Sequence, residues 1–302
     1  MTPVRLTLAC AMALCAFAAN SLLARSALGA GEAGAASFTA LRLLSGAAVL
    51  WVLSRKLRPG APRATEAGWP SAAALLLYAA PFSWAYLKMG AGVGALLLFG
   101  AVQTTMFAAA LAHGERPPLR VWAGLGVALC GLAALTLPGA HAPPAAAALA
   151  MLCAGASWGW YSLRGRRARD GLCATADAFV RAGPAAAVLW GIAALWAPPA
   201  AHLSGRGIAL ALASGGLASG LGYTIWNTVL PYLSAARAGV VQIATPALTA
   251  VAAVALLGEP VTARLVIGGA AITGGVTLAV LGRIRRAVAA TAVARAGGAR
   301  QS

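Results

Sequence analysis

His113-Gly114-Glu115-Arg116-Pro117 separates two long apolar stretches, and its central Gly-Glu pair occurs again later in the chain. The pair and two glycines that follow it, Gly124 and Gly131, recur at a constant offset of 144 residues. Four matches at one spacing indicate a single module that is used twice. The matching residues are Gly258, Glu259, Gly268 and Gly275.

Further matches extend this repeat toward the N-terminus. The stretch Ala48-Val49-Leu50-Trp51 recurs verbatim as Ala187-Val188-Leu189-Trp190, and at the same offset of 139 residues Arg42 falls on Arg181. The offsets differ only by small changes in loop length. The sequence therefore predicts one repeat over residues 1–138 and a second over 139–286, followed by a disordered basic tail at 287–302.

Composition indicates an integral membrane protein. The chain is 61% hydrophobic and only 10% charged, with a mean hydropathy of +0.81, whereas a soluble domain carries about 25% charged residues. Its apolar runs approach the ~20 residues that a helix needs to cross a bilayer. We therefore predict an all-α membrane protein with ten spans. The spans cover about residues 6–24, 37–54, 70–88, 93–112, 119–137, 145–163, 176–197, 207–230, 238–257 and 265–282.

The net charge of +17 does not indicate a nucleic-acid-binding protein. Such binding needs basic residues gathered on one folded surface, but here they lie in short loops between apolar runs. The five cysteines form no CxxC motif and do not cluster with histidine, so we predict neither a disulfide nor a metal site. Nothing in the pattern calls for a cofactor.

The number of spans in each repeat determines the predicted topology. Five crossings are an odd number, so the second copy is inverted and a pseudo-two-fold axis lies in the membrane plane. With the N-terminus inside, seventeen basic residues fall on the cytoplasmic side and four on the other, which predicts two cytoplasmic termini. The first span also resembles a signal peptide, with Arg5 before an apolar core. Its repeat partner in the second half favours a true span.

Arg42 and Arg181 are the first candidates for function, because a charge within a span is costly and usually functional. Our interpretation is that they flank the two mouths of a central cavity and attract an anionic or zwitterionic substrate. The alternative is that each long side chain extends to the membrane surface and stays hydrated.

Glu115 and Glu259 each follow a glycine where one span ends and the next begins. The structural interpretation is that the glycine ends the helix and the carboxylate is favoured by the dipole of the helix that follows. The alternative is a role in proton coupling. None of the six acidic residues lies in the middle of a span, so the buried carboxylate relay of many proton-driven transporters is absent from the predicted spans.

Polar and aromatic residues at span depth are the other candidates for substrate binding. A buried amide in lipid needs a partner, so such side chains are expected to face the bundle interior, either as ligand contacts or as helix–helix contacts. Helix breakers at Pro81, Pro184 and Pro246 and four glycines in the eighth span predict interrupted helices around the site. The candidates besides the two arginines are Asn20, Tyr86, Gln103, Trp158, Tyr161, Tyr223, Trp226, Asn227 and Gln242.

The repeats and several short phrases resemble the EamA-type group of the drug/metabolite transporter superfamily. These phrases include Gly100-Ala101-Val102-Gln103-Thr104, Ser157-Trp158-Gly159 and Gly220-Leu221-Gly222-Tyr223. The resemblance covers about residues 6–282 and implies export or exchange of small metabolites, amino acids among them, across the bacterial inner membrane. One departure is that Pro246 of the second copy has no proline counterpart in the first copy, where residues 99–102 lie at the equivalent depth.

The sequence therefore favours a secondary transporter that works by alternating access, with the bilayer and a small-molecule substrate as partners. A membrane-embedded enzyme acting on lipid-linked substrates is the competing hypothesis, and a structural or sensory protein is a third. An enzyme needs a catalytic set facing one cavity, but His113, His141 and His202 lie in separate loops. The substrate, the coupling ion and the formation of a homodimer stay open.

Overall fold

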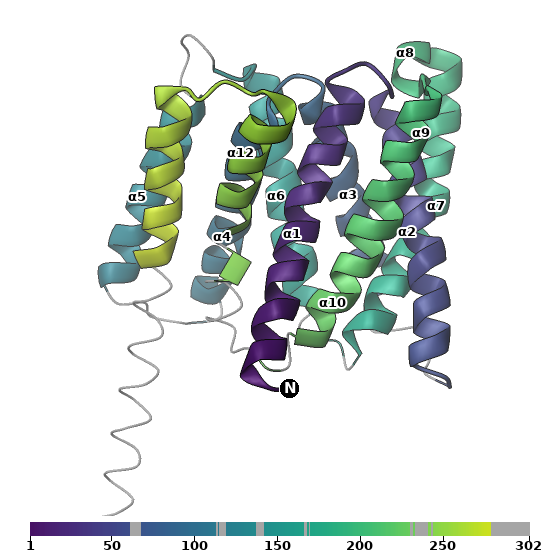
Figure 1. The fold of residues 1–302 in the computed structure, drawn as a ribbon, viewed down its shortest axis with the longest axis horizontal. Coiled ribbons are helices and arrows are strands. Elements are labelled where there is room, and N and C mark those ends of the chain that lie inside the picture. Colours follow the sequence, from purple (N-terminus) through teal and green to yellow (C-terminus); the bar gives the residue numbers. More distant parts are fainter. Residues whose placement is uncertain are drawn as a thin grey trace, which may run out of the picture.

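The computed structural model describes residues 1–60, 68–112, 114, 119–136, 142–165, 168, 170–229, 232, 241–242 and 244–278. These residues form a bundle of helices whose axes run roughly side by side (Figure 1), and no β-strand occurs among them. The helices are α1 (Pro3–Leu28), α2 (Ala35–Leu57), α3 (Gly68–Tyr86), α4 (Ala91–Ala112), α5 (Leu119–Thr136), α6 (Ala145–Gly165), α7 (Gly171–Trp196), α8 (Pro198–Ala201), α9 (Gly205–Leu212), η1 (Ala213–Leu221), α10 (Gly222–Val229), α12 (Ala244–Leu257) and a last helix over Ala263–Leu278.

Five helical segments among the described residues, one of them made of α9, η1 and most of α10, are long and apolar enough to cross a membrane, which supports the predicted class of membrane protein. Three shorter apolar helices, Leu119–Leu135, Ala244–Leu257 and Ala263–Leu278, accompany them. Glu115 and the predicted tail at 287–302 lie outside the described residues. The five long segments are Val4–Leu28, Ala35–Leu57, Ala91–Ala109, Gly171–Trp196 and Gly205–Trp226.

Helices that are distant in the sequence pack closely because small residues line their contacts. α6 packs against α3 and α4, and a Cβ atom at Gly155 would overlap the backbone of Leu98 in α4. α5 and the last helix approach in the same way, since a Cβ at Gly275 would overlap the backbone of Gly124 and Ala128. Small residues of this kind let membrane helices touch, and these glycines have that role here.

Two of the three predicted helix breaks at proline are wrong. α3 continues through Pro81 and α7 continues through Pro184, as membrane helices can when neighbouring groups satisfy the freed carbonyl. Pro246 lies in the first turn of α12, as that helix is described, rather than in its middle. A proline is tolerated in a first turn because its missing N–H would have no partner there in any case.

The predicted irregularity in the eighth span is present, as a π-helix. After α9, the nine residues of η1 form wide turns before α10 resumes the α-helical path. Gly215 of η1 lies against α2 so closely that a Cβ atom would overlap the backbone carbonyl of Arg42. Because π-helical turns are rare and concentrate at functional sites, this segment directs attention to the residues around Arg42.

The two Gly-Glu pairs share one backbone feature. Gly114 has φ 81° after α4, and Gly258 has φ 65° after α12. These values lie in the left-handed region that glycine adopts without strain, which is the common way to end a helix. The prediction that both glycines end helices is therefore confirmed.

Candidate functional site

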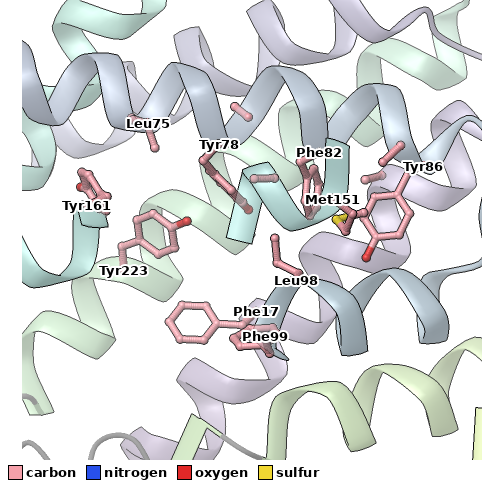
Figure 2. Close-up of a cluster of buried hydrophobic side chains, with 14 of the residues drawn as sticks. Phe17, Leu75, Tyr78, Phe82, Tyr86, Leu98, Phe99, Met151, Tyr161 and Tyr223 are labelled. Carbon is pink, nitrogen blue, oxygen red and sulfur yellow. The ribbon is translucent and has the colours of Figure 1, made fainter. Parts of the chain in front are cut away.

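A pocket lies where α1, α3, α4, α6 and α10 meet. The volume open to the centre of a water-sized sphere is about 20 Å³, so in this conformation the pocket has room for about one water molecule and must widen to admit a solute. Most of its wall is aromatic or aliphatic, and its polar side-chain groups are one amide, one serine hydroxyl, two phenols and the indole N–H of Trp158. We call it the aromatic pocket; its residues are Phe17, Asn20, Ser21, Tyr78, Phe82, Leu98, Phe99, Trp158 and Tyr223. Figure 2 shows the buried cluster around it and labels Phe17, Tyr78, Phe82, Leu98, Phe99 and Tyr223.

Asn20 joins the pocket to the π-helix. In the amide orientation that gives every atom a complementary partner, Nδ2 donates to Ser214 Oγ at 2.6 Å, and Oδ1 accepts from Ser219 Oγ at 3.1 Å. In the same orientation Oδ1 also accepts from Arg42 Nη2 at 3.0 Å. In an α-helix, two residues five apart point in different directions, whereas the wider turns of η1 bring both serines to one amide.

Arg42 lies behind this polar part of the pocket wall and is only 1% exposed. Its Nη2 donates to the Tyr78 hydroxyl at 2.7 Å, and its Cζ lies 5.1 and 4.7 Å from the ring centroids of Tyr78 and Phe82. Among the residues that the structure describes, its Nε and Nη1 have no hydrogen-bond partner. A guanidinium stays charged in proteins, so a full positive charge is buried here without a carboxylate among the described residues.

Arg181, the repeat counterpart of Arg42, has a different environment. Its Nε donates to Asp177 Oδ1 at 2.8 Å, one turn earlier on α7. Its Cζ lies 5.3 Å from the ring centroid of Trp69. The charge of Arg181 is therefore matched within the protein, and Arg181 is not among the residues that line the aromatic pocket.

Glu259, in the second predicted repeat, contacts three residues of the first. Its Oε1 accepts from the backbone N–H of Ala91 at 2.6 Å and its Oε2 accepts from that of Gly92 at 3.2 Å. Arg25 Nε lies 3.7 Å from Oε1. The carboxylate thus caps α4, where the helix dipole favours a negative charge, rather than the helix that follows Glu259 as the sequence predicted. We call this contact the Glu259 cap.

The structure brings only part of the predicted substrate site together. Asn20, Trp158 and Tyr223 line the aromatic pocket. Arg42 contacts its wall, as described above, and Tyr161 stacks on Trp158 at 5.3 Å. Tyr86 and Trp226 are buried next to pocket residues, through Phe82 and Phe17 respectively. Gln103 and Gln242 are half-buried and do not line the pocket, and the side chain of Asn227 is outside the described residues.

Sequence reasoning missed Tyr78 and Phe82, which contact Arg42. Their signal was present: Tyr78, Phe82 and Tyr86 are spaced four residues apart and so lie on one face of α3. The serines of η1 gave a weaker signal, because Ser214 and Ser219 have no common face unless the helix widens. Over the described ranges, no group of three or more His, Cys, Asp or Glu side chains is placed to hold a metal ion.

Comparisons with known proteins agree with this arrangement. Uncharacterized protein PA1977 of Pseudomonas aeruginosa is 48% identical over 277 residues, which are 91% of this chain and 94% of that protein. A protein of known crystal structure has the same fold, with a TM-score of 0.65 and 20% identity over 93% of this chain and 98% of its own. The sequence profile of the EamA-like transporter family matches residues 145–281. The chain is therefore a multi-pass membrane protein that belongs to the EamA-like transporter family of the drug/metabolite transporter superfamily.

Proposed function

We propose that this protein is a secondary transporter that exports or exchanges small metabolites, amino acids or related solutes, by alternating access. It acts in the bacterial inner membrane with both termini in the cytoplasm. The substrate binds in the aromatic pocket, between two inverted five-helix repeats at residues 1–138 and 139–286. Membership of the EamA-like transporter family supports transport in general, and the following observations support this particular arrangement.

The pattern of helix contacts supports the inverted repeat. In the proposed repeats, α1 corresponds to α6, α3 corresponds to η1 with α10, and α4 corresponds to α12. The contacts match this correspondence: α3 and α4 both pack on α6, whereas η1 with α10 and α12 all pack on α1. α2 packs on its own counterpart α7, and α4 on α12. The contacts at the two ends of α2 indicate that it is antiparallel to α7, because Arg58 pairs with Asp170 at one end and the Gly34 N–H donates to His202 O at the other. An inverted pair of repeats requires such an orientation.

The position of the pocket supports alternating access. Seven of its lining residues come from the first repeat, whereas Trp158 and Tyr223 come from the second. A site that both repeats share is remodelled when one repeat moves against the other. The pocket is therefore in the place where such a motion exposes it to each side of the membrane in turn.

Contacts between the repeats at one end of the bundle support a closed state at that end. The Glu259 cap attaches the second repeat to α4, as described above. Nearby in the fold, Ser204 Oγ donates to Glu32 Oε2 at 2.6 Å, and the backbone N–H of Ser204 donates to Glu32 O at 2.8 Å. These polar contacts must separate for the bundle to open there.

The observation that carries the proposal is a buried, unneutralised Arg42 beside a pocket that both repeats line. The test compares the solutes in the culture medium of cells that overproduce the protein, cells that lack it and cells that produce Arg42→Ala. We expect particular small solutes to accumulate with the wild type and to fall to the level of the deletion strain with Arg42→Ala. Arg55→Gln, on the same helix but exposed, is the matched control and is expected to behave as wild type.

Size-exclusion profiles of the detergent-extracted variants establish that each protein is inserted and folded. Identical media from the overproducing and deletion strains, together with no exchange of labelled amino acids or labelled monocarboxylates in proteoliposomes, would show that the protein is not a transporter of this class. If the wild type exports solutes and a folded Arg42→Ala does so equally well, the aromatic pocket is not the transport site.

A further inference from the structure

The guanidinium of Arg42 has unused hydrogen-bonding capacity inside the bundle. Of its five N–H groups, the one on Nε and the two on Nη1 have no acceptor within the described part of the chain. Its contacts through Nη2 are with neutral groups, the Tyr78 hydroxyl and the Asn20 amide. A buried charge is normally paired, because taking an ion out of water is costly. The missing partner is therefore an anion.

The described acidic side chains cannot supply this anion because each of them already has a partner. Asp177 pairs with Arg181, Asp170 pairs with Arg58, Glu259 caps α4, and Glu32 accepts from Ser204. These contacts occur at the helix ends or on α7. Because no free carboxylate remains for Arg42 among the described residues, we look for its counter-charge in a molecule that enters the pocket.

The polar part of the pocket wall can transmit the charge of Arg42 to such a molecule. Because the Tyr78 oxygen accepts from Arg42, its own proton is available to another acceptor. The Tyr223 hydroxyl is its neighbour, and Figure 2 shows the two phenols side by side. Hydrogen bonds in a chain of this kind polarise and strengthen one another. An anion in the pocket therefore meets phenolic donors backed by a fixed positive charge.

The rest of the wall determines the body of the ligand. Phe17, Phe82, Phe99 and Trp158 provide aromatic surfaces, and Leu98 adds an aliphatic one. Trp158 also contacts Tyr78 and Tyr223, with ring centroids 4.9 and 5.0 Å apart. Such a wall favours an apolar or planar aromatic body over a sugar or a polyol, whose hydroxyl groups would lose their hydrogen bonds to water.

We propose that the aromatic pocket binds organic monocarboxylates with an aromatic or apolar body, and that the ligand carboxylate is the counter-ion of Arg42. This inference rests on the function proposed above and on the same site, and it narrows the substrates from small metabolites and amino acids in general to monocarboxylates without an ammonium group. One uncompensated positive charge matches one negative charge. A phosphate dianion would leave an excess negative charge in the bundle, and an amino-acid zwitterion would bring an ammonium group that no described carboxylate of the pocket can pair.

The test measures binding to the purified full-length protein by the shift of its melting temperature with ligand concentration. The probes are 3-phenylpropionate, its neutral amide 3-phenylpropionamide, the zwitterion phenylalanine and the dianion phenyl phosphate. We expect 3-phenylpropionate to bind at least about tenfold more tightly than each of the other three. Arg42→Gln is expected to remove this preference by weakening carboxylate binding about tenfold or more while leaving amide binding unchanged, and Arg55→Gln is expected to retain it.

Three results would overturn the inference: no shift with 3-phenylpropionate, equal or tighter binding of any of the other three probes, or unchanged carboxylate binding in a folded Arg42→Gln. The inference and the transport proposal fail in different ways. If neutral or cationic solutes are exported and Arg42→Gln still exports them, the protein is a transporter and the monocarboxylate site is wrong. If 3-phenylpropionate binds as expected but no solute crosses the membrane, the site stands and the transport proposal is wrong.

Discussion

Arg42 and Arg181 occupy matched positions in the two predicted repeats, but the fold treats their charges in opposite ways. Arg181 is paired with Asp177 on its own helix and lies over Trp69. Arg42 is almost completely buried and retains three N–H groups without an acceptor. Among the described residues, the first charge has an internal partner and the second has none, which is the basis of the ligand site proposed above. Repetition of a residue therefore does not imply repetition of its role.

The largest expected effect comes from breaking the packing that buries Arg42. Gly215→Val would place a Cβ atom on the backbone carbonyl of Arg42, so the contact between η1 and α2 cannot form as it is. We expect a loss of about 3 kcal/mol in stability, seen as a lower melting temperature and aggregation on size exclusion. Gly216→Ala is the matched control, because its Cβ would meet only Val49 at 3.4 Å. Equal stability of the two variants would contradict the close approach.

The next effect compares the two arginines directly. Arg42→Met removes a buried charge that the protein does not pair, so the ligand-free variant should be as stable as the wild type or about 1 kcal/mol more stable. Arg181→Met removes the charged partner of the buried Asp177 and should cost about 1–2 kcal/mol. Thermal unfolding of both variants without ligand measures the difference. A marked loss of stability in Arg42→Met would mean that Arg42 serves the fold rather than a ligand.

A smaller effect is expected at the Glu259 cap. Glu259→Gln removes the negative charge that accepts from Ala91 and Gly92 and lies near Arg25, which should cost about 1 kcal/mol. The end of the bundle that contains this cap should then open more often. The measurement is the labelling rate of a cysteine introduced as Lys88→Cys, in the loop before α4, with a membrane-impermeant maleimide. We expect a severalfold faster rate than in the Lys88→Cys protein with Glu259 intact, and an unchanged rate would show that the cap does not hold this end closed.

The smallest expected effect on stability concerns Asp170. This residue is the N-cap of α7 and pairs with Arg58 at the C-terminal end of α2. Burial alone would raise the pKa of Asp170, but hydrogen bonds from the Cys173 N–H and from Arg58 outweigh it and lower the pKa. Because the folded-state pKa lies below the unfolded one, this contribution to stability is complete above about pH 4 to 5 and is lost as the pH falls through the folded-state pKa.

The contribution of Asp170 should stay below about 1 kcal/mol, because Arg58 is more than half exposed and water screens the pair. Asp170→Asn keeps a capping side chain and is the variant to compare with the wild type. The melting temperatures of the two proteins should differ at pH 7 and converge as the pH is lowered toward 3. A difference that grows on acidification would reverse the assigned direction of the pKa.

Much of this fold could be predicted from the sequence, because hydropathy and helix length depend on local residues. The predicted span at 93–112, for example, corresponds to α4 at Ala91–Ala112, and the left-handed glycines at the ends of α4 and α12 follow from the Gly-Glu pairs. The partners of polar side chains could not be predicted in the same way. Glu259 caps a helix of the other repeat, and Tyr78 contacts Arg42 from another helix, so both contacts depend on how the helices assemble.

The side-chain contacts of the π-helix η1 could not be predicted from the sequence either. Four glycines predicted an irregular eighth span, but not that Ser214 and Ser219 would share Asn20 as a partner. That outcome depends on the wide turns of η1, in which Gly215 lies directly against the backbone of Arg42. The sequence therefore indicated where the site lies more clearly than which side chains complete it.

The Glu259 cap also has a consequence for biogenesis. The amide of Ala91 and the carboxylate that caps it are 168 residues apart in the chain. When α4 leaves the ribosome, its first turn therefore lacks its permanent acceptor, and water or lipid headgroups must solvate those amides until the last helices have been made. The N-terminus of α4 therefore obtains its cap only after the chain has been synthesised as far as Glu259, and a chain that stops earlier leaves these amides without it.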